Sequence, residues 1–149
     1  MVTNISQNLE ETLRLGESWG NEADTGWVFG FSGELGAGKT QLVRGIARGL
    51  GYSGRVHSPT FAILHTYNGG RFPIAHLDLY RLNRKEEIIQ ADLSDHLENP
   101  DGVSLVEWYD RWCEAWEAPY LAPGVRLRRV LLKTLSENAR EISHEDFGA

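Results

Sequence analysis

Hydrophobic positions along the chain follow two recurring patterns, one typical of strands and one of helices. Short apolar runs rich in strand-forming residues occupy 27–31, 62–67, 73–77, 103–106, 125–132 and 140–143. Apolar residues recur at helical spacing in 9–19, 41–50 and 83–97, and a shorter helix is predicted at 109–117. Asn68-Gly69-Gly70, between two of the strands, is a strong hairpin signal. Strands that alternate with helices, with at least one hairpin, predict a single-domain, three-layer α/β protein with a mixed parallel and antiparallel sheet.

The same pattern predicts helix starts and buried faces. Asn8 followed by Glu11 resembles a capping box. The apolar face of the first helix is expected to contain Leu9, Leu13, Gly16 and Trp19. The apolar face of the 83–97 helix is expected to contain Ile88, Ile89, Leu93 and Leu97. Trp108, Trp112 and Trp116 share one helical face, which favours core packing, although Trp108 could instead stack on a base or face a partner. The ends 1–7 and 144–149 of the 1–149 domain are expected to be flexible.

Composition excludes several classes of function. A hydrophobic content of 41% and a charged content of 24% are ordinary for a soluble globular protein. The formal net charge of −6 argues against a protein that coats nucleic acid, which needs a basic surface. A single cysteine, Cys113, excludes a disulfide framework within the chain, and the five histidines show no metal-ligand spacing. Neither a leader-like start nor a long apolar window is present, so we expect a cytoplasmic protein without a membrane span.

Residues 33–40 read Gly-Glu-Leu-Gly-Ala-Gly-Lys-Thr and match the phosphate-binding loop G-x-x-x-x-G-K-[ST]. This loop lies between a predicted strand and a predicted helix, which is the context in which such a loop binds phosphate. Lys39 is expected to reach the β- and γ-phosphates and the Thr40 hydroxyl to hold Mg²⁺. The residues expected to bind the nucleotide are Gly33, Leu35, Gly36, Ala37, Gly38, Lys39 and Thr40. The sequence therefore predicts a P-loop NTPase that binds a nucleoside triphosphate.

Two acids follow apolar runs and are candidates to complete this site. Asp78 comes directly after 73–77, and Glu107 directly after 103–106. Ligands in open α/β sheets gather at the carboxyl ends of strands, so either acid could ligate Mg²⁺, directly or through water, or orient the attacking water. Spacing alone does not decide which acid touches the metal.

Ser58-Pro59-Thr60-Phe61 lies between the P-loop helix and the next strand. Nucleotide switches often place a hydroxyl there that senses the γ-phosphate, whereas a Ser-Pro pair by itself is more often only a turn.

Four motifs in order carry a family resemblance: GELGAGKT at 33–40, SPTF at 58–61, HLDLYRL at 76–82 and VEW at 106–108. Together they resemble the TsaE family (also YjeE), the small bacterial P-loop ATPases that work in forming threonylcarbamoyladenosine on tRNA. The resemblance runs from about Glu10 to Arg140. It implies slow ATP hydrolysis, a complex with two paralogous partners of which one carries the transferase active site, and only indirect contact with tRNA.

The resemblance also implies roles for individual residues. Thr40 and Glu107 would be the Mg²⁺ ligands, Asp78 an essential acid and Thr60 a switch residue. Further contacts to the nucleotide are implied for Trp108, for Asp110 and Arg140, and for a stretch near Leu9–Thr12. The chain has Tyr109 where family members often have proline after the Glu-Trp pair, so the path after Trp108 is the expected point of departure.

Three other functions are alternatives to the one that the family resemblance implies. A small-molecule or nucleoside kinase would need an arginine-bearing lid, for which 81–85 is the one short candidate. A GTPase is disfavoured because no N/T-K-x-D or D-x-x-G motif follows the loop. A nucleotide-gated assembly factor, which transforms no substrate of its own, is close to the function that the family resemblance implies.

Overall fold

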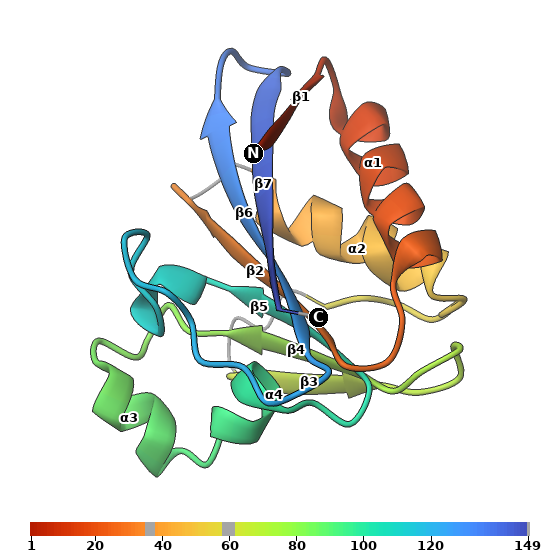
Figure 1. Cartoon of the computed structure of the whole chain (residues 1–149). Helices are drawn as coiled ribbons and strands as arrows, with labels where there is room; N and C mark the ends of the chain where they lie inside the picture. The colour runs from red at the N-terminus through yellow and green to blue at the C-terminus, as the bar shows by residue number, and fades with distance from the viewer. Residues whose placement is uncertain (35–37, 58–61, 149) are drawn as a thin grey trace.

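A seven-stranded sheet in the order β1-β7-β6-β2-β5-β4-β3 forms the centre of the computed structural model, which describes residues 1–34, 38–57 and 62–148. Strand β2 lies in the middle, parallel to β5 and β6, and β4 continues the parallel part beside β5. Strands β3, β7 and β1 pair antiparallel. The strands are β1 Val2–Ser6, β2 Trp27–Gly33, β3 Leu64–Tyr67, β4 Ile74–Asp78, β5 Val103–Glu107, β6 Arg126–Thr134 and β7 Arg140–Gly148. The predicted mixed α/β sheet is confirmed (Figure 1).

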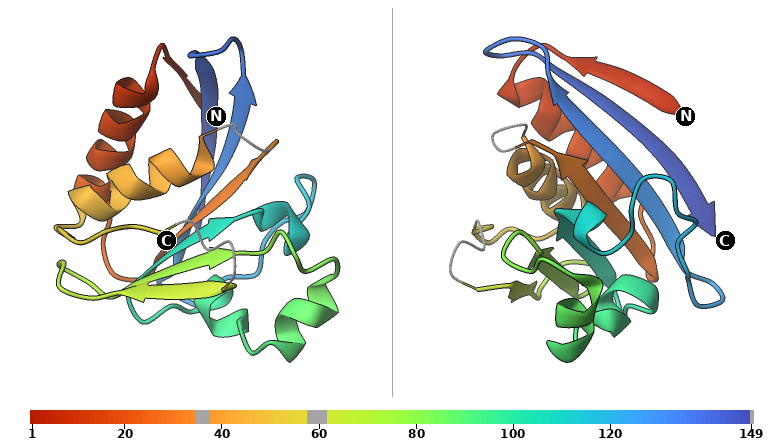
Figure 2. Two further views of the ribbon diagram at one scale, coloured as in Figure 1. Left: turned by 180° about the vertical axis from the view of Figure 1, so that it is seen from behind. Right: turned by 90° about the vertical axis from the view of Figure 1, so that its left-hand side faces the viewer.

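Helices cover both faces of this sheet (Figures 1 and 2). Phe29 and Leu105 belong to the core cluster under α1 and α2, whereas their neighbours Val28 and Val106 belong to the cluster under α3 and α4, because successive strand residues point to opposite faces. The helical elements are α1 Leu9–Glu22, α2 Lys39–Gly49, α3 Lys85–Gln90, α4 Ser94–Glu98 and the 3₁₀ turn η1 Tyr109–Arg111. The three predicted layers are therefore present.

Helices α1 and α2 cross at pairs of glycines. A Cβ added to Gly20 of α1 would lie 2.3 Å from the Ile46 carbonyl oxygen, and one added to Gly49 of α2 would lie 2.2 Å from the Glu17 carbonyl oxygen. The two backbones are thus in direct contact, which only glycine permits. This contact fixes α2, and with it the Lys39 and Thr40 that begin the helix.

The predicted start of α1 is correct and one of its predicted core residues is wrong. The Asn8 side chain accepts a hydrogen bond from the Glu11 N–H at 2.9 Å, and the Glu11 carboxylate accepts from the N–H of Gln7. Leu9, in contrast, is 61% exposed, because the first turn of α1 extends past the packed surface, while Leu13 and Trp19 are buried as expected.

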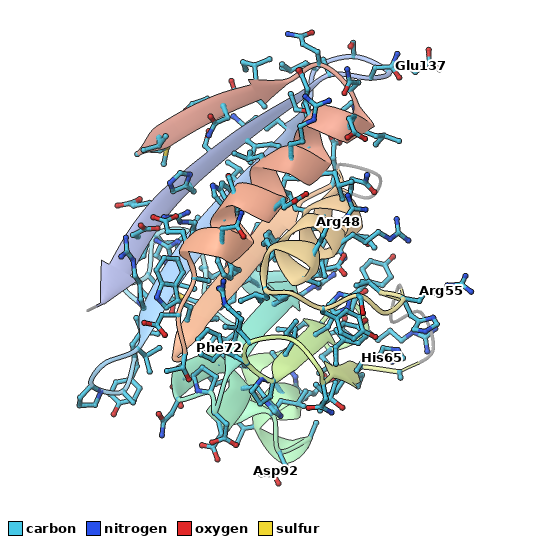
Figure 3. The ribbon with its side chains drawn as sticks, turned by 90° about the vertical axis from the view of Figure 1, so that its right-hand side faces the viewer. Arg48, Arg55, His65, Phe72, Asp92 and Glu137 are labelled. Carbon is cyan, nitrogen blue, oxygen red and sulfur yellow. The ribbon has the colours of Figure 1, made fainter. Side chains whose placement is uncertain are left out.

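The predicted helix at 83–97 is two short helices, α3 and α4. Asp92 adopts a left-handed backbone conformation with φ of 62° just after α3 and is labelled at the bottom of the view in Figure 3. The N–H of Asp92 bonds to the Ile89 carbonyl and that of Leu93 to the Ile88 carbonyl, which is the pairing of a Schellman cap. Ile88 and Leu93 are buried, whereas Ile89 is 52% exposed and not part of the predicted apolar face.

The predicted helix at 109–117 is also wrong, since only η1 forms. Trp108 takes a left-handed conformation with φ of 59° and breaks any shared helical face. Trp112 is buried and Trp116 is 80% exposed. Tyr109 is fully buried, and a Cβ on Gly30 of β2 would meet its ring at 2.5 Å. The chain thus accommodates Tyr109 by placing its ring over a glycine of the central strand.

The ends expected to be flexible are paired strands. Val2–Ser6 pair with Arg140–His144 of β7, and the end of β7 from His144 to Gly148 pairs with Arg126–Val130 of β6. Val2 and Ile5 are about half exposed, and the backbone ladder rather than burial holds β1, which is why hydrophobic pattern did not reveal it. In the part of the chain that the structure describes, no helix is long and apolar enough to cross a membrane.

Candidate nucleotide and metal site

The ends of three parallel strands converge at the start of α2. β2 ends at Gly33, and α2 begins at Lys39 after Gly38, which has a left-handed φ of 99°. In the sheet register Phe31 of β2 lies opposite Glu107 of β5, and Glu107 lies opposite Asp78 of β4. Residues at paired positions of a parallel sheet point to the same face. The two acids predicted from the sequence are therefore neighbours beside the loop. Leu35, Gly36, Ala37, Thr60 and the rest of 58–61 lie outside the described residues.

Lys39 is buried at the base of the loop. Its Nζ donates hydrogen bonds to the carbonyl oxygens of Gly33 at 2.7 Å and Glu34 at 2.9 Å, and lies 4.4 Å from the centroid of the Trp108 ring. Burial lowers the pKa of the Lys39 ammonium, although the charge of Glu107 opposes this shift. The ammonium is thus held by two carbonyl dipoles and by the face of the Trp108 ring. Phosphate oxygens could replace these contacts.

Glu107 connects the loop helix to the strands. The residue is 4% exposed, and its Oε1 accepts a hydrogen bond from the Thr40 hydroxyl at 3.1 Å. The Oε2 atom lies 2.6 Å from Nε2 of His76 on β4. Thr40 and Glu107, predicted as a pair of Mg²⁺ ligands, are thus in direct contact.

Asp78 ends β4 next to Glu107. Its Oδ1 accepts a hydrogen bond from the Tyr80 N–H at 2.9 Å, which fixes the carboxylate at the turn after the strand. Burial raises the pKa of the Asp78 carboxyl, and the charge of Glu107 acts in the same direction. The charge of the nearby Lys39 acts against this rise, and a bound cation would do the same.

The donor set fits Mg²⁺. The site offers one hydroxyl and carboxylate oxygens, the hard ligands that this ion prefers, and Mg²⁺ at nucleotide sites usually takes only one or two carboxylates. Among the described residues, no hydrogen-bond donor reaches the buried Oδ1 of Asp110, whose charge also acts on Lys39. An unpartnered buried carboxylate oxygen beside the loop is a further place for a cation, a water or a ligand N–H.

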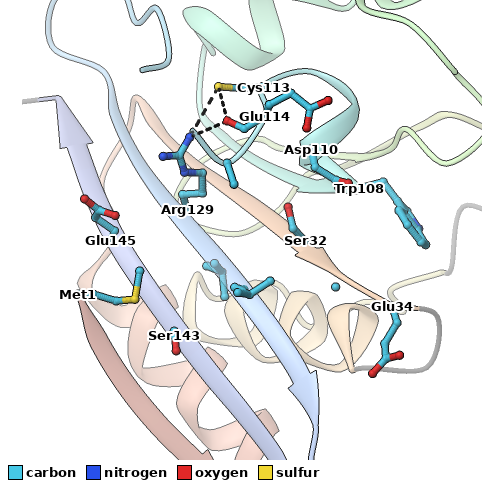
Figure 4. Close-up of a pocket in the computed structure, with 14 residues that line it drawn as sticks. Met1, Ser32, Glu34, Trp108, Asp110, Cys113, Glu114, Arg129, Ser143 and Glu145 are labelled. Atoms are coloured by element: carbon cyan, nitrogen blue, oxygen red, sulfur yellow. Dashed lines mark hydrogen bonds between the residues drawn. The ribbon is translucent and has the colours of Figure 1, made fainter. Parts of the chain in front are cut away.

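A pocket of 520 Å³ opens beside the loop on the sheet face away from α2 (Figure 4). Glu34, Trp108 and Asp110 line its side nearest the loop. Its other side contains Arg129, whose guanidinium donates to the Glu117 carbonyl at 2.9 Å, and Cys113, whose thiol has a pKa raised by burial. Trp108 and Asp110, both predicted to contact the nucleotide, thus line the same pocket, and the Trp108 ring also contacts Lys39.

Arg140 and the 9–12 stretch are placed at the same end of the sheet as the loop. Arg140 of β7 lies opposite Thr134 of β6, two positions along β6 from the Leu132–Ile142 pair. Its guanidinium donates a hydrogen bond to the Ser136 carbonyl at 2.9 Å. Gln41 of α2 donates to the Leu9 carbonyl at 3.4 Å, so the start of α1 lies beside the start of α2. Nucleotide contacts from either segment stay a prediction.

Two side chains that were not predicted from the sequence, His76 and Tyr67, also belong to this site. His76 is fully buried, and besides Glu107 it contacts the Tyr67 hydroxyl, which lies 2.9 Å from its Nδ1. No two histidines share a ligand spacing, so the histidine pattern alone did not indicate a role for His76. The signal was present: His76 lies two residues before Asp78 in an otherwise apolar strand, so both side chains point to one face.

The class of this protein is a single-domain α/β fold with a mixed seven-stranded sheet, in which the sequence pattern G-x-x-x-x-G-K-T lies between the central strand β2 and the helix α2. Within this class, the family described as "Threonylcarbamoyl adenosine biosynthesis protein TsaE" matches residues 6–142, and the chain belongs to that family. The process in which this family works is therefore tRNA threonylcarbamoyladenosine biosynthesis, as the four motifs predicted.

Individual relatives agree. The chain is 36% identical over 141 residues to the tRNA threonylcarbamoyladenosine biosynthesis protein TsaE of Bacillus subtilis (strain 168). The aligned region covers 95% of this chain and 83% of the relative. It is 34% identical over 139 residues to the protein of the same name from Treponema pallidum (strain Nichols), covering 93% and 96%. The crystal structure of Bacillus subtilis YdiB superimposes with a TM-score of 0.68 at 29% identity, over 96% of this chain and 83% of that chain.

Proposed function

We propose that this protein binds ATP with Mg²⁺ at the 33–40 loop and hydrolyses it slowly, as the nucleotide-dependent subunit of the cytoplasmic assembly that forms threonylcarbamoyladenosine next to the anticodon of tRNA. The observation that carries the proposal is the direct contact of Thr40 with Glu107 beside the buried Lys39. Family membership supports the process, and the site supports the chemistry.

Each residue has a defined task in this proposal. Lys39 exchanges its two carbonyl contacts for β- and γ-phosphate oxygens. Thr40 and Glu107 hold the metal, and Asp78, next to Glu107, accepts a hydrogen bond from the attacking water. When bound, Mg²⁺ would neutralise charge on the phosphate oxygens.

The partners in this proposal are the two paralogous proteins of the transferase complex. The net charge of −6 supports contact with tRNA through these proteins rather than through the chain itself, because a surface of this sign is repelled by phosphate. ATP turnover should accordingly be low for the isolated chain and rise when the partners are present.

Ligand-dependent thermal unfolding tests nucleotide binding. At a ligand concentration 100 times Kd, Mg-ATP or Mg-ADP should stabilise the fold by about 2.7 kcal/mol, which corresponds to a rise in Tm of roughly 5–10 °C for a domain of this size. Lys39→Ala should lose most of this rise. Lys133→Ala is the matched control, since Lys133 is exposed and lies 4.0 Å from Glu141 on β7. GTP should bind less well. A wild-type Tm that does not change with millimolar Mg-ATP would contradict the proposal.

A small-molecule kinase is the second candidate, and the 520 Å³ pocket beside the loop is the observation that favours it. The possible lid residues Arg84 and Lys85 line a different pocket, together with Arg111. Release of inorganic phosphate without a phosphorylated small molecule supports the ATPase, whereas a phosphorylated metabolite supports the kinase.

A further inference from the structure

A continuous line of polar groups, buried from Glu107 to Tyr67, leads away from Glu107 through the sheet. Glu107 Oε2 lies 2.6 Å from His76 Nε2, and His76 Nδ1 lies 2.9 Å from the Tyr67 hydroxyl. The Tyr67 oxygen is in turn 3.3 Å from both the N–H and the carbonyl oxygen of His57. The line thus runs from β5 across β4 and β3 to the residue directly before 58–61.

Proton positions along this line follow from the acceptor at its end. An ionised Glu107 carboxylate can only accept, so Nε2 of His76 carries the proton and donates it. With Nε2 as the donor, Nδ1 is the acceptor in the tautomer that these contacts favour, and the donor that faces it among the described residues is the Tyr67 hydroxyl. Burial raises the pKa of the Tyr67 phenol, which keeps this proton in place. The Tyr67 oxygen is left to accept from the His57 N–H, so each bond from Glu107 to the His57 N–H has one donor and one acceptor. In this arrangement the His57 carbonyl oxygen receives no proton from Tyr67.

The two oxygens of Glu107 are therefore both assigned. Oε1 accepts from Thr40 on α2, and Oε2 accepts from His76. Since His76 is fully buried and Tyr67 is 5% exposed, neither ring can turn without breaking the line. Side chains that orient a metal-binding carboxylate or imidazole in this way commonly determine metal affinity.

We propose that His76 and Tyr67 are positioning residues for the magnesium site, which hold the Glu107 carboxylate in the orientation that leaves Oε1 to the metal and Thr40. This inference rests on the proposed function of the site. His76 and Tyr67 touch neither nucleotide nor metal, and act only through Glu107.

The chain offers a matched pair of hydroxyl deletions. Tyr67→Phe removes the donor to His76 and leaves the ring in place. Tyr52 stacks on Tyr67 with ring centroids 5.0 Å apart, but its hydroxyl donates to the Arg55 carbonyl and is not part of the line. Tyr52→Phe therefore removes a hydroxyl from the same aromatic cluster, which lies at the edge of the sheet where Figure 3 labels Arg55 and His65, without touching Glu107.

The readout is the ratio of the ADP dissociation constant in EDTA to that in Mg²⁺, measured by titration calorimetry. Tyr67→Phe should lower this ratio roughly 3- to 10-fold, the value of one hydrogen bond, and Tyr52→Phe should leave it unchanged. His76→Phe, which removes the donor to Glu107, should lower it roughly 10- to 100-fold. His76→Gln should recover part of that loss because its amide N–H can still reach Glu107. The dissociation constant in EDTA should be the same for all variants.

Two results would overturn the inference. One is a Tyr67→Phe protein whose ratio equals that of wild type and Tyr52→Phe. The other is a loss of ADP affinity of equal size with and without Mg²⁺, which indicates general damage to the loop. The Tyr67→Phe comparison decides the matter even if His76→Phe does not fold. Failure of the proposed function is distinguishable, because the wild-type protein itself would then bind no ADP in Mg²⁺.

Discussion

Alanine at Gly20 should destabilise the protein, although alanine is the better helix former. In an exposed helix the exchange would stabilise by about 1 kcal/mol. Here the new Cβ would lie 2.3 Å from the Ile46 carbonyl oxygen and 2.8 Å from the Gly49 Cα, whereas ordinary contact begins at 3.4 Å. The neighbours of this Cβ are backbone atoms, which cannot turn away as a side chain can.

The magnitude follows from the distance that must be recovered. Relief of the clash requires α1 and α2 to separate by about 1 Å. Overpacking usually destabilises a protein by about 1–3 kcal/mol, and a contact with rigid backbone atoms belongs at the upper end, about 3 kcal/mol. After subtraction of the gain in helix propensity, Gly20→Ala should lower the free energy of unfolding by about 2 kcal/mol. For a domain of this length that is a fall in Tm of roughly 4–8 °C.

Urea unfolding followed by circular dichroism, with differential scanning calorimetry, measures the change. Ser18→Ala is the control, because Ser18 lies on the exposed side of the same helix and its hydroxyl donates only to the Leu15 carbonyl. Gly49→Ala should cost a similar amount, and the double variant less than twice as much, because both changes are relieved by the same separation. A Gly20→Ala protein that is more stable than wild type would refute the close backbone crossing.

Two further predictions concern acids. Asp78→Asn and Glu107→Gln should each lower ATP turnover, by roughly 100-fold or more for Asp78→Asn, and only Glu107→Gln should also shift the Mg²⁺ dependence. Phosphate release at varied Mg²⁺ concentration measures both effects. Turnover like wild type in both variants would remove the acids from the mechanism. Asp146 is held by a hydrogen bond from Arg128 that lowers the pKa of its carboxyl from 3.8 to about 2. Because the folded pKa is the lower one, its contribution to stability is complete above about pH 4 and is lost as pH falls through about 2. The difference in unfolding free energy between wild type and Asp146→Asn should therefore shrink over that range, and a difference independent of pH would contradict the assignment.

The parts of the fold with a strong periodic signal were predictable from the sequence. The apolar strand and the amphipathic helix predicted within 27–50 agree with β2 and α2 of the structure. Residues 35–37 of the glycine-rich loop between them lie outside the described residues. Asp78 and Glu107 could be found because the carboxyl ends of parallel strands meet at one edge of a sheet.

Features that depend on distant contacts were not predictable. Strand β1 lacks a buried apolar face and exists through its ladder to β7, which is more than 130 positions away in sequence. The break at Asp92 depends on a left-handed residue that is usually glycine or asparagine, so aspartate gave little warning. His76 became a site residue only when the β4–β5 register placed it against Glu107.

The central claim is that nucleotide binding at the 33–40 loop serves tRNA modification. Nucleoside mass spectrometry of bulk tRNA from a strain depleted of this protein tests it most directly, with wild type, Lys39→Ala or Lys133→Ala supplied in return. Threonylcarbamoyladenosine should fall on depletion, recover with wild type and Lys133→Ala, and stay low with Lys39→Ala at equal protein level. A normal level of the modified nucleoside when the protein is absent, or full recovery with Lys39→Ala, would contradict the account.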